Sequence, residues 1–488
     1  MTDRGDQRRR FLIGLGAGAV GGVASGAVAL HARGTPTRGA VPEVNVRDMG
    51  ATGDGTTDDT AAFNRATDAA APWSPALERR ILVPPGRYRI AGTVHIRKGQ
   101  DLAGSGYATQ FDARRVSEST FVLGRAQGAS ENDPGGAPVR ISGFRALGSA
   151  PRAPFIAVRA EGFSIENLFL TAVGTGIHIQ GADGIVRDVI IDQALNGIVF
   201  DHAQNVLVGG FYTYLANYAV TAIEACADIA IANSLFCYSR YAAVLFTEGG
   251  RSLRGMTFTG CSFLQNEQFD TFSGYVQSRA SDVDALFTGC QFRNWSGFAI
   301  DHGAGRNVAL TFNGCIFDAL ATNPVYNQAK TSNCVRTGLE SRFRFDACEF
   351  RNLGGVVAAA GPGARLAITG GIVENCREPL LAVDRAAGEM RVRDVAGFAM
   401  GRDGWSVPSW PGATWRIVAR LSDPGGRHIV EEVIVSDDGG EAPMVQHLIG
   451  PAATTLNVAL RPLPNRAILI AASVAGWRLI GLETSTFG

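Results

Sequence analysis

The sequence predicts an all-β protein built as a solenoid of stacked strands, and two observations carry this prediction. The phrase F-x-x-C-x-F occurs four times, as FTGCSF, FTGCQF, FNGCIF and FDACEF, at residues 258–263, 287–292, 312–317 and 345–350. Apolar and small residues alternate with a period of two inside each phrase, which indicates strands rather than helices. Repeats of roughly 20–30 residues with this alternation are typical of stacked coils.

Looser copies extend the pattern in both directions. Counted at the third residue of each phrase, consecutive copies are separated by 21 to 33 residues. We therefore expect about ten coils, stacked about 4.8 Å apart. The looser copies start at Ile165, Val186, Leu207 and Ile231 before the four strict phrases, and at Ile368 and Val392 after them.

All eight cysteines lie in this repeated region. Four of them occupy the fourth position of the phrase, so we expect them to form one buried column: Cys261, Cys290, Cys315 and Cys348. No C-x-x-C pair occurs, so a structural zinc site is not expected. Cysteines on adjacent coils are within reach of a disulfide. We favour free thiols, because cysteine is a common small buried residue.

The N-terminus, residues 1–32, has the features of a twin-arginine signal peptide. Arg8, Arg9, Phe11 and Leu12 fit the R-R-x-F-L core, and a glycine- and alanine-rich apolar run follows to about Leu30. Cleavage after residue 29 or after residue 32 both fit the sequence. An uncleaved membrane anchor is the competing interpretation. The signal implies a periplasmic or secreted protein, with no stable membrane span after processing.

Two segments resemble a known family. VRDMGATGDGTTDDTAAF at 46–63 and ILVPPGRYRI at 81–90 resemble the opening of the pectate-lyase-superfamily domain of rhamnogalacturonase-like enzymes, epimerase-like proteins and phage tailspikes. The resemblance implies a right-handed parallel β-helix over residues 41–400, closed at one end by a short N-terminal helix. We expect Thr57 to cap that helix, and Asp58 and Asp59 to lie in its first turn. Together with Asp54 they are interpreted as structural rather than metal-binding.

The last segment, residues 401–488, changes character. The repeated phrase stops, four of the six tryptophans appear, and short apolar runs alternate with turn residues. This predicts a small antiparallel β-domain. Its expected role is to cover the open end of the solenoid, whose strand edge would otherwise invite aggregation. Carbohydrate binding and oligomer formation are left open for it.

Charge and motifs limit the function without naming a reaction. The chain carries 45 basic and 45 acidic residues, which argues against a nucleic-acid partner bound through bulk charge. The only lysines are Lys98 and Lys330, so the Arg-x-Lys motif of polygalacturonase-like hydrolases is absent. The Asp-Pro-His-Asp motif of alginate epimerases is absent as well. Calcium is left open as a cofactor.

Outward-facing polar residues suggest a catalytic site. Alternation in the second strand of each repeat places His178, Gln180 and Asp201 on the outer surface. Asp201 and Glu224 fall on adjacent coils, a separation that suits a cooperating carboxylate pair. Arg240 is expected to hold or deprotonate a uronic acid. The catalytic hypothesis is thus Asp201, Glu224 and Arg240, with Asp301 and His302 as the next pair. His202, which also follows an aspartate, is expected to be idle.

Aromatic residues gather in the same stretch. Aromatic side chains beside a groove can stack on sugar rings. The substrate-binding set therefore consists of His178, Gln180, Tyr212, Tyr214, Tyr218, Tyr238, Tyr241 and Trp295.

Two classes of function remain. The first is an exported carbohydrate-active enzyme, a polysaccharide lyase or glycoside hydrolase that acts on an acidic polysaccharide. The alternative is a noncatalytic polysaccharide-binding or tailspike-like structural protein. The family resemblance, the export signal and the aromatic and acidic face favour the enzyme, and the missing catalytic signatures favour the alternative.

Overall fold

The computed structural model describes residues 43–70, 78–124, 138–148, 153–247, 252–265, 274–295, 297–302, 305–319, 332–355, 357–360, 363–374 and 376, followed by separate strands between 381 and 487. The signal-peptide segment lies outside the described residues. Among the described residues, no helix is both long and apolar enough to cross a lipid bilayer.

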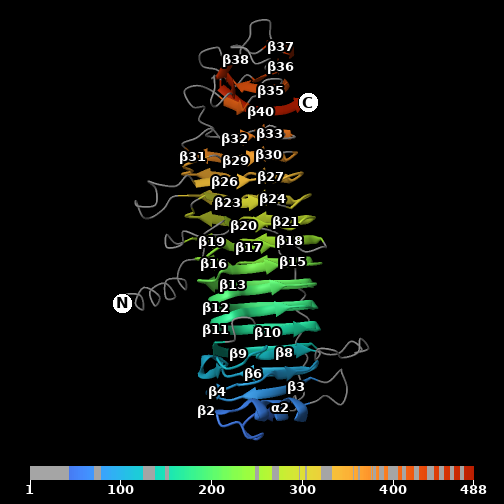
Figure 1. Cartoon of the computed structure of the whole chain (residues 1–488), viewed down its shortest axis with the longest axis vertical. Helices are drawn as coiled ribbons and strands as arrows, with labels where there is room; N and C mark the ends of the chain where they lie inside the picture. The colour runs from blue at the N-terminus through green and yellow to red at the C-terminus, as the bar shows by residue number, and fades with distance from the viewer. Residues whose placement is uncertain are drawn as a thin grey trace, which may run out of the picture. The chain divides into compact units, whose positions relative to one another are not determined.

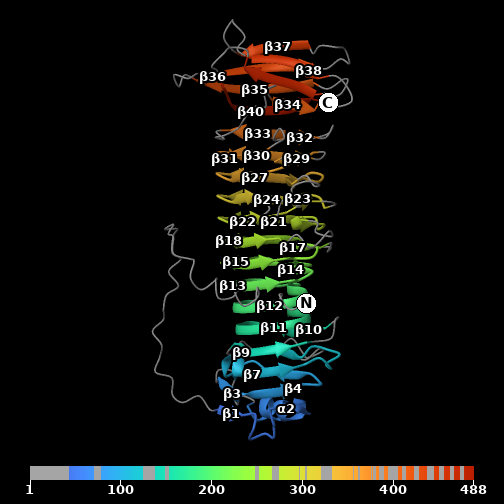
Figure 2. The same ribbon diagram turned by 90° about the vertical axis from the view of Figure 1, so that its left-hand side faces the viewer.

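Parallel strands stack into three columns, and the chain passes through each column once per coil (Figures 1 and 2). The first column contains β1 (Glu43–Asn45), β3 (Arg79–Val83), β6 (Gln100–Gly104), β9 (Val139–Leu147), β11 (Glu161–Ile179), β12 (Ala182–Phe200), β13 (Gln204–Tyr214), β15 (Ala227–Ala232), β18 (Leu253–Thr259), β21 (Val283–Thr288), β24 (Ala309–Asn313), β27 (Arg342–Asp346), β30 (Arg365–Thr369) and β33 (Glu389–Arg393).

The long strands β9, β11, β12 and β13 continue from the first column into the second. The other strands of the second column are β2 (Asp54–Asp58), β4 (Gly86–Arg89), β7 (Thr109–Asp112), β16 (Leu235–Cys237), β19 (Ser262–Leu264), β22 (Gln291–Arg293), β25 (Ile316–Asp318), β28 (Glu349–Arg351) and β31 (Ile372–Glu374).

The third column begins with short strands and takes in the ends of β11 and β12. Its other members are β5 (Val94–Ile96), β8 (Phe121–Gly124), β10 (Pro154–Arg159), β14 (Tyr218–Ala222), β17 (Ala242–Phe246), β20 (Gly274–Ser278), β23 (Gly297–His302), β26 (Ser332–Arg336), β29 (Ala358–Ala360) and β32 (Leu381–Val383). The predicted parallel β-helix is therefore confirmed. The ten phrases all contribute strands to the first column, and four coils, those of β1, β3, β6 and β9, precede them.

The third residue of the repeated phrase makes the bend between the first and second columns. Asn167, Asp188, Gly260 and Ala347 all have a positive φ there. Only glycine adopts this left-handed conformation without strain, and asparagine and aspartate tolerate it best among other residues. In the phrase at Leu207 the bend falls on Gly210, because Arg187 pairs with Gly209 and Val189 with Phe211.

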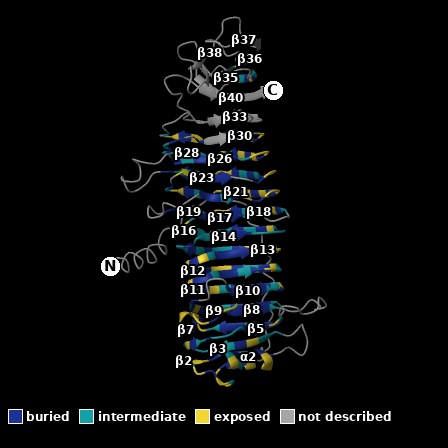
Figure 3. Ribbon diagram, in the orientation of Figure 1, coloured by how far each residue is buried: buried dark blue, intermediate teal, exposed yellow. Residues whose placement is uncertain are grey.

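Two phenylalanine ladders and one cysteine ladder fill the core between the four strict phrases (Figure 3 shows the buried interior). Neighbouring rings of the first ladder lie 4.6 to 4.9 Å apart, and those of the second 4.6 to 5.4 Å apart. The four predicted cysteines are buried in one column and unbridged, as expected. Each thiol points at a carbonyl of the preceding coil, as Cys290 Sγ does at Phe258 O over 3.4 Å.

Helix α2 (Thr60–Ala69) closes the first coils and packs Phe63 against Tyr88 and Phe111. The prediction for its cap was wrong in detail. The Asp58 carboxylate, and not Thr57, accepts the Thr60 N–H at 3.0 Å. Thr57 instead donates to Asp54, because Asp54 closes the preceding turn.

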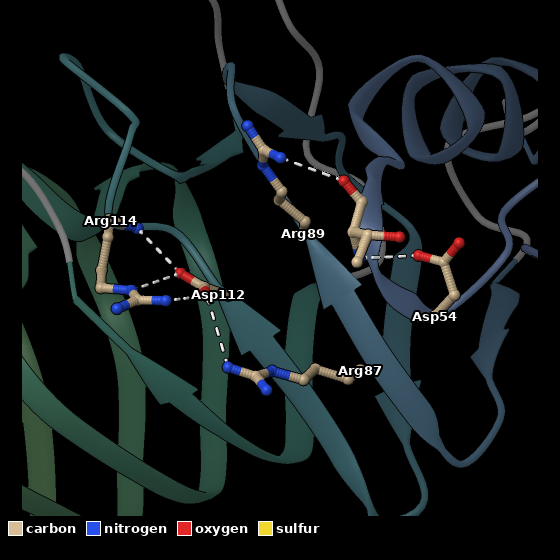
Figure 4. A network of polar contacts seen from close by, with 6 residues as sticks. Asp54, Arg87, Arg89, Asp112 and Arg114 are labelled. Carbon is tan, nitrogen blue, oxygen red and sulfur yellow. Dashed lines mark hydrogen bonds and ion pairs between the residues drawn. The ribbon is translucent and has the colours of Figure 1, made fainter.

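Polar contacts tie the second column together beside this helix (Figure 4). Arg114 donates to both oxygens of Asp112 at 2.9 and 2.6 Å, and Arg87 approaches the same carboxylate at 3.6 Å. Arg114 holds the pKa of Asp112 below its usual range. Hydrogen bonds from the backbone N–H groups of Thr57 and Thr56 hold the pKa of Asp54 well below its usual range. These contacts are structural, as the sequence indicated for Asp54.

The chain ends in antiparallel strands. β40 (Arg478–Phe487) pairs with β33, the last described strand of the first column, and continues the sheet through β35 (Thr414–Ser422), β36 (His428–Ser436) and β37 (Met444–Ile449). A second sheet contains β34 (Trp405–Pro408), β39 (Ala467–Ala472) and β38 (Leu456–Arg461). β40 thus covers a strand edge that would otherwise be open to another chain.

The bend residue Ala347 gives a direct test of the phrase. It is exposed and has a φ of 51°, so its Cβ is strained there. Ala347→Gly should raise the stability by about 0.5–1 kcal/mol, seen as a higher denaturation midpoint. The control Ala367→Gly, inside strand β30, should lower stability by a similar amount. A lower midpoint for Ala347→Gly would contradict the strained bend.

Candidate functional site

Asp201 is held by side chains from two successive coils. It directly follows β12, and its carboxylate accepts hydrogen bonds from Gln180 Nε2 at 2.8 Å and from His202 Nδ1 at 2.8 Å. His178 Nε2 lies 3.4 Å from Asp201 Oδ2. The Asp201 side chain is 17% exposed, so it is partly shielded from water but can be reached. We call Asp201, His178, Gln180 and His202 the Asp201 cluster.

The local backbone explains why these groups meet. Gln180 follows the end of β11 in the same way that Asp201 follows the end of β12, and the Ile179–Phe200 pairing stacks them on neighbouring coils. His202 has a φ of 55°, an uncommon conformation for a residue with a Cβ. This bend follows the strand end and leaves the His202 ring within hydrogen-bond distance of Asp201.

The surroundings of His178 and Asp201 favour different charge states for the two side chains. Burial lowers the pKa of His178 more than the nearby Asp201 charge raises it, so the neutral form of this imidazole is favoured. Burial raises the pKa of Asp201, but hydrogen bonds from His202 and Gln180 outweigh it and the net shift is downward. An ionised carboxylate beside a neutral imidazole is an arrangement that can take up and return a proton near neutral pH.

Glu224 and Arg240 do not join the cluster in the way that the sequence predicted. Phe200 pairs with Ala222, so Glu224 is level with His202 and not with Asp201. The His202 N–H donates to the Glu224 carbonyl at 2.7 Å. The extra residue before Glu224 therefore shifts this carboxylate by one position along its coil. Glu224 lies on the adjacent coil, as expected, but one residue beyond the position that is level with Asp201.

Arg240 lies beside the N-terminal ends of the third-column strands, whereas Asp201 lies beside their C-terminal ends. It precedes β17, where Ala242 is level with Tyr218 and Asn196. Asn196 is five residues before Asp201, a separation of roughly 16 Å along the strand. The Arg240 guanidinium lies 5.6 Å from the centre of the Tyr241 ring.

The predicted tyrosines form pairs around Arg240. Tyr214 and Tyr238 meet edge to face with centroids 5.0 Å apart, and the Tyr218 and Tyr241 centroids are 5.6 Å apart. All four are half-buried, as is Tyr212 on the outer side of β13. We call these five residues the tyrosine surface. It offers aromatic groups to a sugar, but at a distance from Asp201.

Trp295 must be removed from the predicted binding set. Its side chain is 4% exposed and packs near Tyr275, and its indole N–H donates to the Asn333 carbonyl at 2.7 Å. Its position after β22 brings the ring into the interior, where a sugar cannot stack on it.

Asp301 belongs to a separate arrangement, four coils from β12 along the third column. Arg336 donates to both of its carboxylate oxygens, at 2.8 and 2.7 Å. His302 is 1% exposed, and burial lowers its pKa. A bidentate ion pair and a buried ring indicate a structural contact here.

Within the described ranges, no three His, Cys, Asp or Glu side chains are arranged to hold a metal ion. The structure brings together the Asp201 cluster beside the C-terminal ends of the third-column strands and the tyrosine surface nearer their N-terminal ends. His202 is the member that sequence reasoning set aside. The signal that could have identified it is its place directly after Asp201 at a strand end.

The fold and these surfaces define a parallel β-helix protein with polar and aromatic groups on its outer strands. Residues 43–136 match the family model described as rhamnogalacturonase A/epimerase, pectate lyase-like. Over these residues the chain is similar to that family, and the coils that follow continue the parallel β-helix. No curated protein sequence matches the chain significantly.

Several solved structures are similar at low identity. The A-module of mannuronan C-5 epimerase AlgE4 from Azotobacter vinelandii is 14% identical, with a TM-score of 0.46 over 72% of this chain and 95% of that one. A family 28 exopolygalacturonase of Yersinia enterocolitica is 12% identical, with a TM-score of 0.43 over 71% and 79%. A tailspike of E. coli bacteriophage HK620, in complex with a pentasaccharide, is 10% identical, with a TM-score of 0.44 over 91% and 93%. Such similarity carries no information about activity.

The charge state of Asp201 can be tested directly. His202→Ala combined with Gln180→Leu removes the two hydrogen bonds that lower its pKa, while the partial burial that raises it remains. The pKa of Asp201 should therefore rise, as measured by carbon-13 NMR titration of the side-chain carboxyl. The variant Asn205→Ala, which loses a hydrogen bond to Asp183 on the same side of the coils, should leave the Asp201 titration unchanged. An unchanged titration in the double variant would contradict the described network.

Proposed function

We propose that this protein is an exported carbohydrate-active β-helix protein that cleaves an acidic polysaccharide, with the Asp201 cluster as its reacting centre. The observation that supports this proposal is the shielded Asp201 carboxylate with His178 at 3.4 Å and His202 at 2.8 Å. Groups with shifted pKa values that meet on an accessible surface are candidates for acid–base chemistry.

The partners of Asp201 favour elimination over hydrolysis. Glycoside hydrolysis commonly uses two carboxyl groups that face each other across the scissile bond. The described partners of Asp201 are instead two imidazoles and an amide. In a lyase reaction, His178 would accept the proton beside the sugar carboxylate, and the ionised Asp201 would stabilise the imidazolium that forms. The glycosidic oxygen would leave as the C=C bond forms, taking a proton from water or from a doubly protonated His202.

The tyrosine surface would hold sugar rings at a distance from this centre. Tyrosine combines an apolar ring with a hydroxyl that can bond to a sugar. The distance of roughly 16 Å along a third-column strand is the length of several linked sugars. One polymer could therefore contact both the tyrosine surface and the Asp201 cluster. Arg240, beside Tyr241, would bind a carboxylate of that polymer rather than deprotonate it.

A noncatalytic polysaccharide-binding protein is the second candidate. The observation that favours it is the separation of the tyrosine surface from Asp201, since the aromatic pairs do not converge on the acid–base groups. It predicts binding of the same polymers without any product.

The enzyme hypothesis predicts a large loss on removing the cluster. Asp201→Asn and His178→Gln should each reduce turnover of a uronic-acid polysaccharide at least about a hundredfold, since general acid–base groups contribute about that much. Ultraviolet absorbance of the unsaturated product reports elimination, and new reducing ends without it report hydrolysis. The control Asp228→Asn changes an exposed bend residue whose φ of 55° asparagine also tolerates, and it should keep full activity. Full activity in both cluster variants would move the site elsewhere.

Export depends on the first residues of the chain, and the proposed location is periplasmic or secreted. Replacing Arg8 and Arg9 with lysine should leave the protein in the cytoplasm, because the paired arginines are the feature that fits a twin-arginine signal. Cell fractionation and immunoblotting measure the distribution. Unchanged export would indicate the general secretory route instead.

A further inference from the structure

A second polar surface lies on the outer side of the first column and does not include the Asp201 cluster. There a groove with a volume of about 860 Å³ crosses strands β18, β21, β24, β27 and β30. Four arginines line it: Arg254, Arg342, Arg344 and Arg365. All four side chains are exposed. We call this surface the arginine groove.

Strand register builds the groove. Ala309, Arg342 and Arg365 are consecutive partners on β24, β27 and β30, and Thr311, Arg344 and Ala367 form the next outward row. The small side chains of Ala309 and Ala367 leave space between the longer ones. On the next strand, β33, the residue paired with Arg365 is Glu389, so the row of arginines ends there.

The register also places like charges side by side. Arg342 and Arg365 are direct partners on adjacent coils, about 4.8 Å apart. Like charges directly opposite each other on a sheet are destabilising. A bound anion between the two guanidinium groups would remove this repulsion.

Most of this positive charge is not neutralised by described side chains. Arg344 is paired with Asp346 at 2.6 Å. Arg254, Arg342 and Arg365 form no ion pair with any side chain that the structure describes. Asp282, at the rim, already accepts a hydrogen bond from Asn307 at 2.7 Å. Among the described side chains, the groove therefore presents three guanidinium groups without an ion pair beside a small number of acidic groups.

The shape of the groove favours an extended anion. From β18 to β30 it covers four coil steps, or roughly 19 Å. Guanidinium groups bind carboxylates through two parallel hydrogen bonds. A nucleic acid is disfavoured, because the chain has no net charge and the groove also contains Asp282 and Asp284.

The groove and the Asp201 cluster are close along the axis. Asp201 follows β12, and β18 lies three coils further on, roughly 14 Å away. The cluster lies where the chain leaves the third column for the first, and Asp282 and Asn307 lie at the same bend. We propose that the arginine groove binds the carboxylates of a polyuronate chain and anchors the polymer outside the reacting centre. The ligand class rests on the proposed function, but binding there does not require cleavage.

The test measures binding separately from turnover. Arg342→Gln combined with Arg365→Gln should weaken binding of a polygalacturonate oligomer about tenfold or more at low salt, as measured by isothermal titration calorimetry. The loss should shrink as salt screens the exposed charges. The control Arg187→Gln removes an exposed arginine from the same face on β12, outside the groove, and should bind like the wild type.

Two further arms separate the outcomes. The methyl ester of the same oligomer, which lacks the charges, should bind wild type as weakly as the free acid binds the double variant. Thermal midpoints should be unchanged or higher in the double variant, since a repulsion is removed. Wild-type affinity in the double variant, or equal binding of acid and ester, would overturn the inference. Arginine-dependent binding without any product from wild type would instead retain the groove and reject the lyase hypothesis.

Discussion

Everything in this protein depends on main-chain hydrogen bonding between coils that stay in register. Once two coils pair, each residue is fixed about 4.8 Å from its equivalent on the next coil. This constraint stacks Phe287 on Phe312 in the core and places Arg342 beside Arg365 on the surface. The same geometry is favourable for apolar rings and unfavourable for like charges. A binding function is therefore expected where the register places like charges on adjacent coils, because their repulsion destabilises the fold unless a ligand offsets it.

The fold could be predicted from the sequence because its determinants are local. The bend residue, the inward cysteine and the two inward phenylalanines all lie within one six-residue phrase, so each copy can be recognised alone. Predictions were weaker where a shift of one residue decides which positions on neighbouring coils are level with each other. Glu224 is level with His202 because its strand carries an additional residue, and Gly210 replaces Gly209 at its bend for a similar reason.

The candidate site was only partly predictable for a different physical reason. Alternation indicates which face a residue occupies, and the structure brings the outward-facing Gln180, His178 and Asp201 together on adjacent coils. It does not indicate the distance between two bends of the same coil. The tyrosines and Asp201 belong to neighbouring sequence segments, yet a whole strand separates them. Trp295 follows a strand as several tyrosines do, but packing against the next coil takes its ring inward.

The near-identity of the coils from β18 to β27 also concerns how such a chain can change over evolutionary time. Each of these coils offers the next one the same phenylalanine rings, thiol and bend. Duplication or loss of one coil would therefore restore the same contacts across the new junction, with little change in stability per coil. The surface rows would lengthen or shorten by one step at the same time. The reach of a ligand-binding face on this scaffold is thus a whole number of coils, adjustable by a single genetic event.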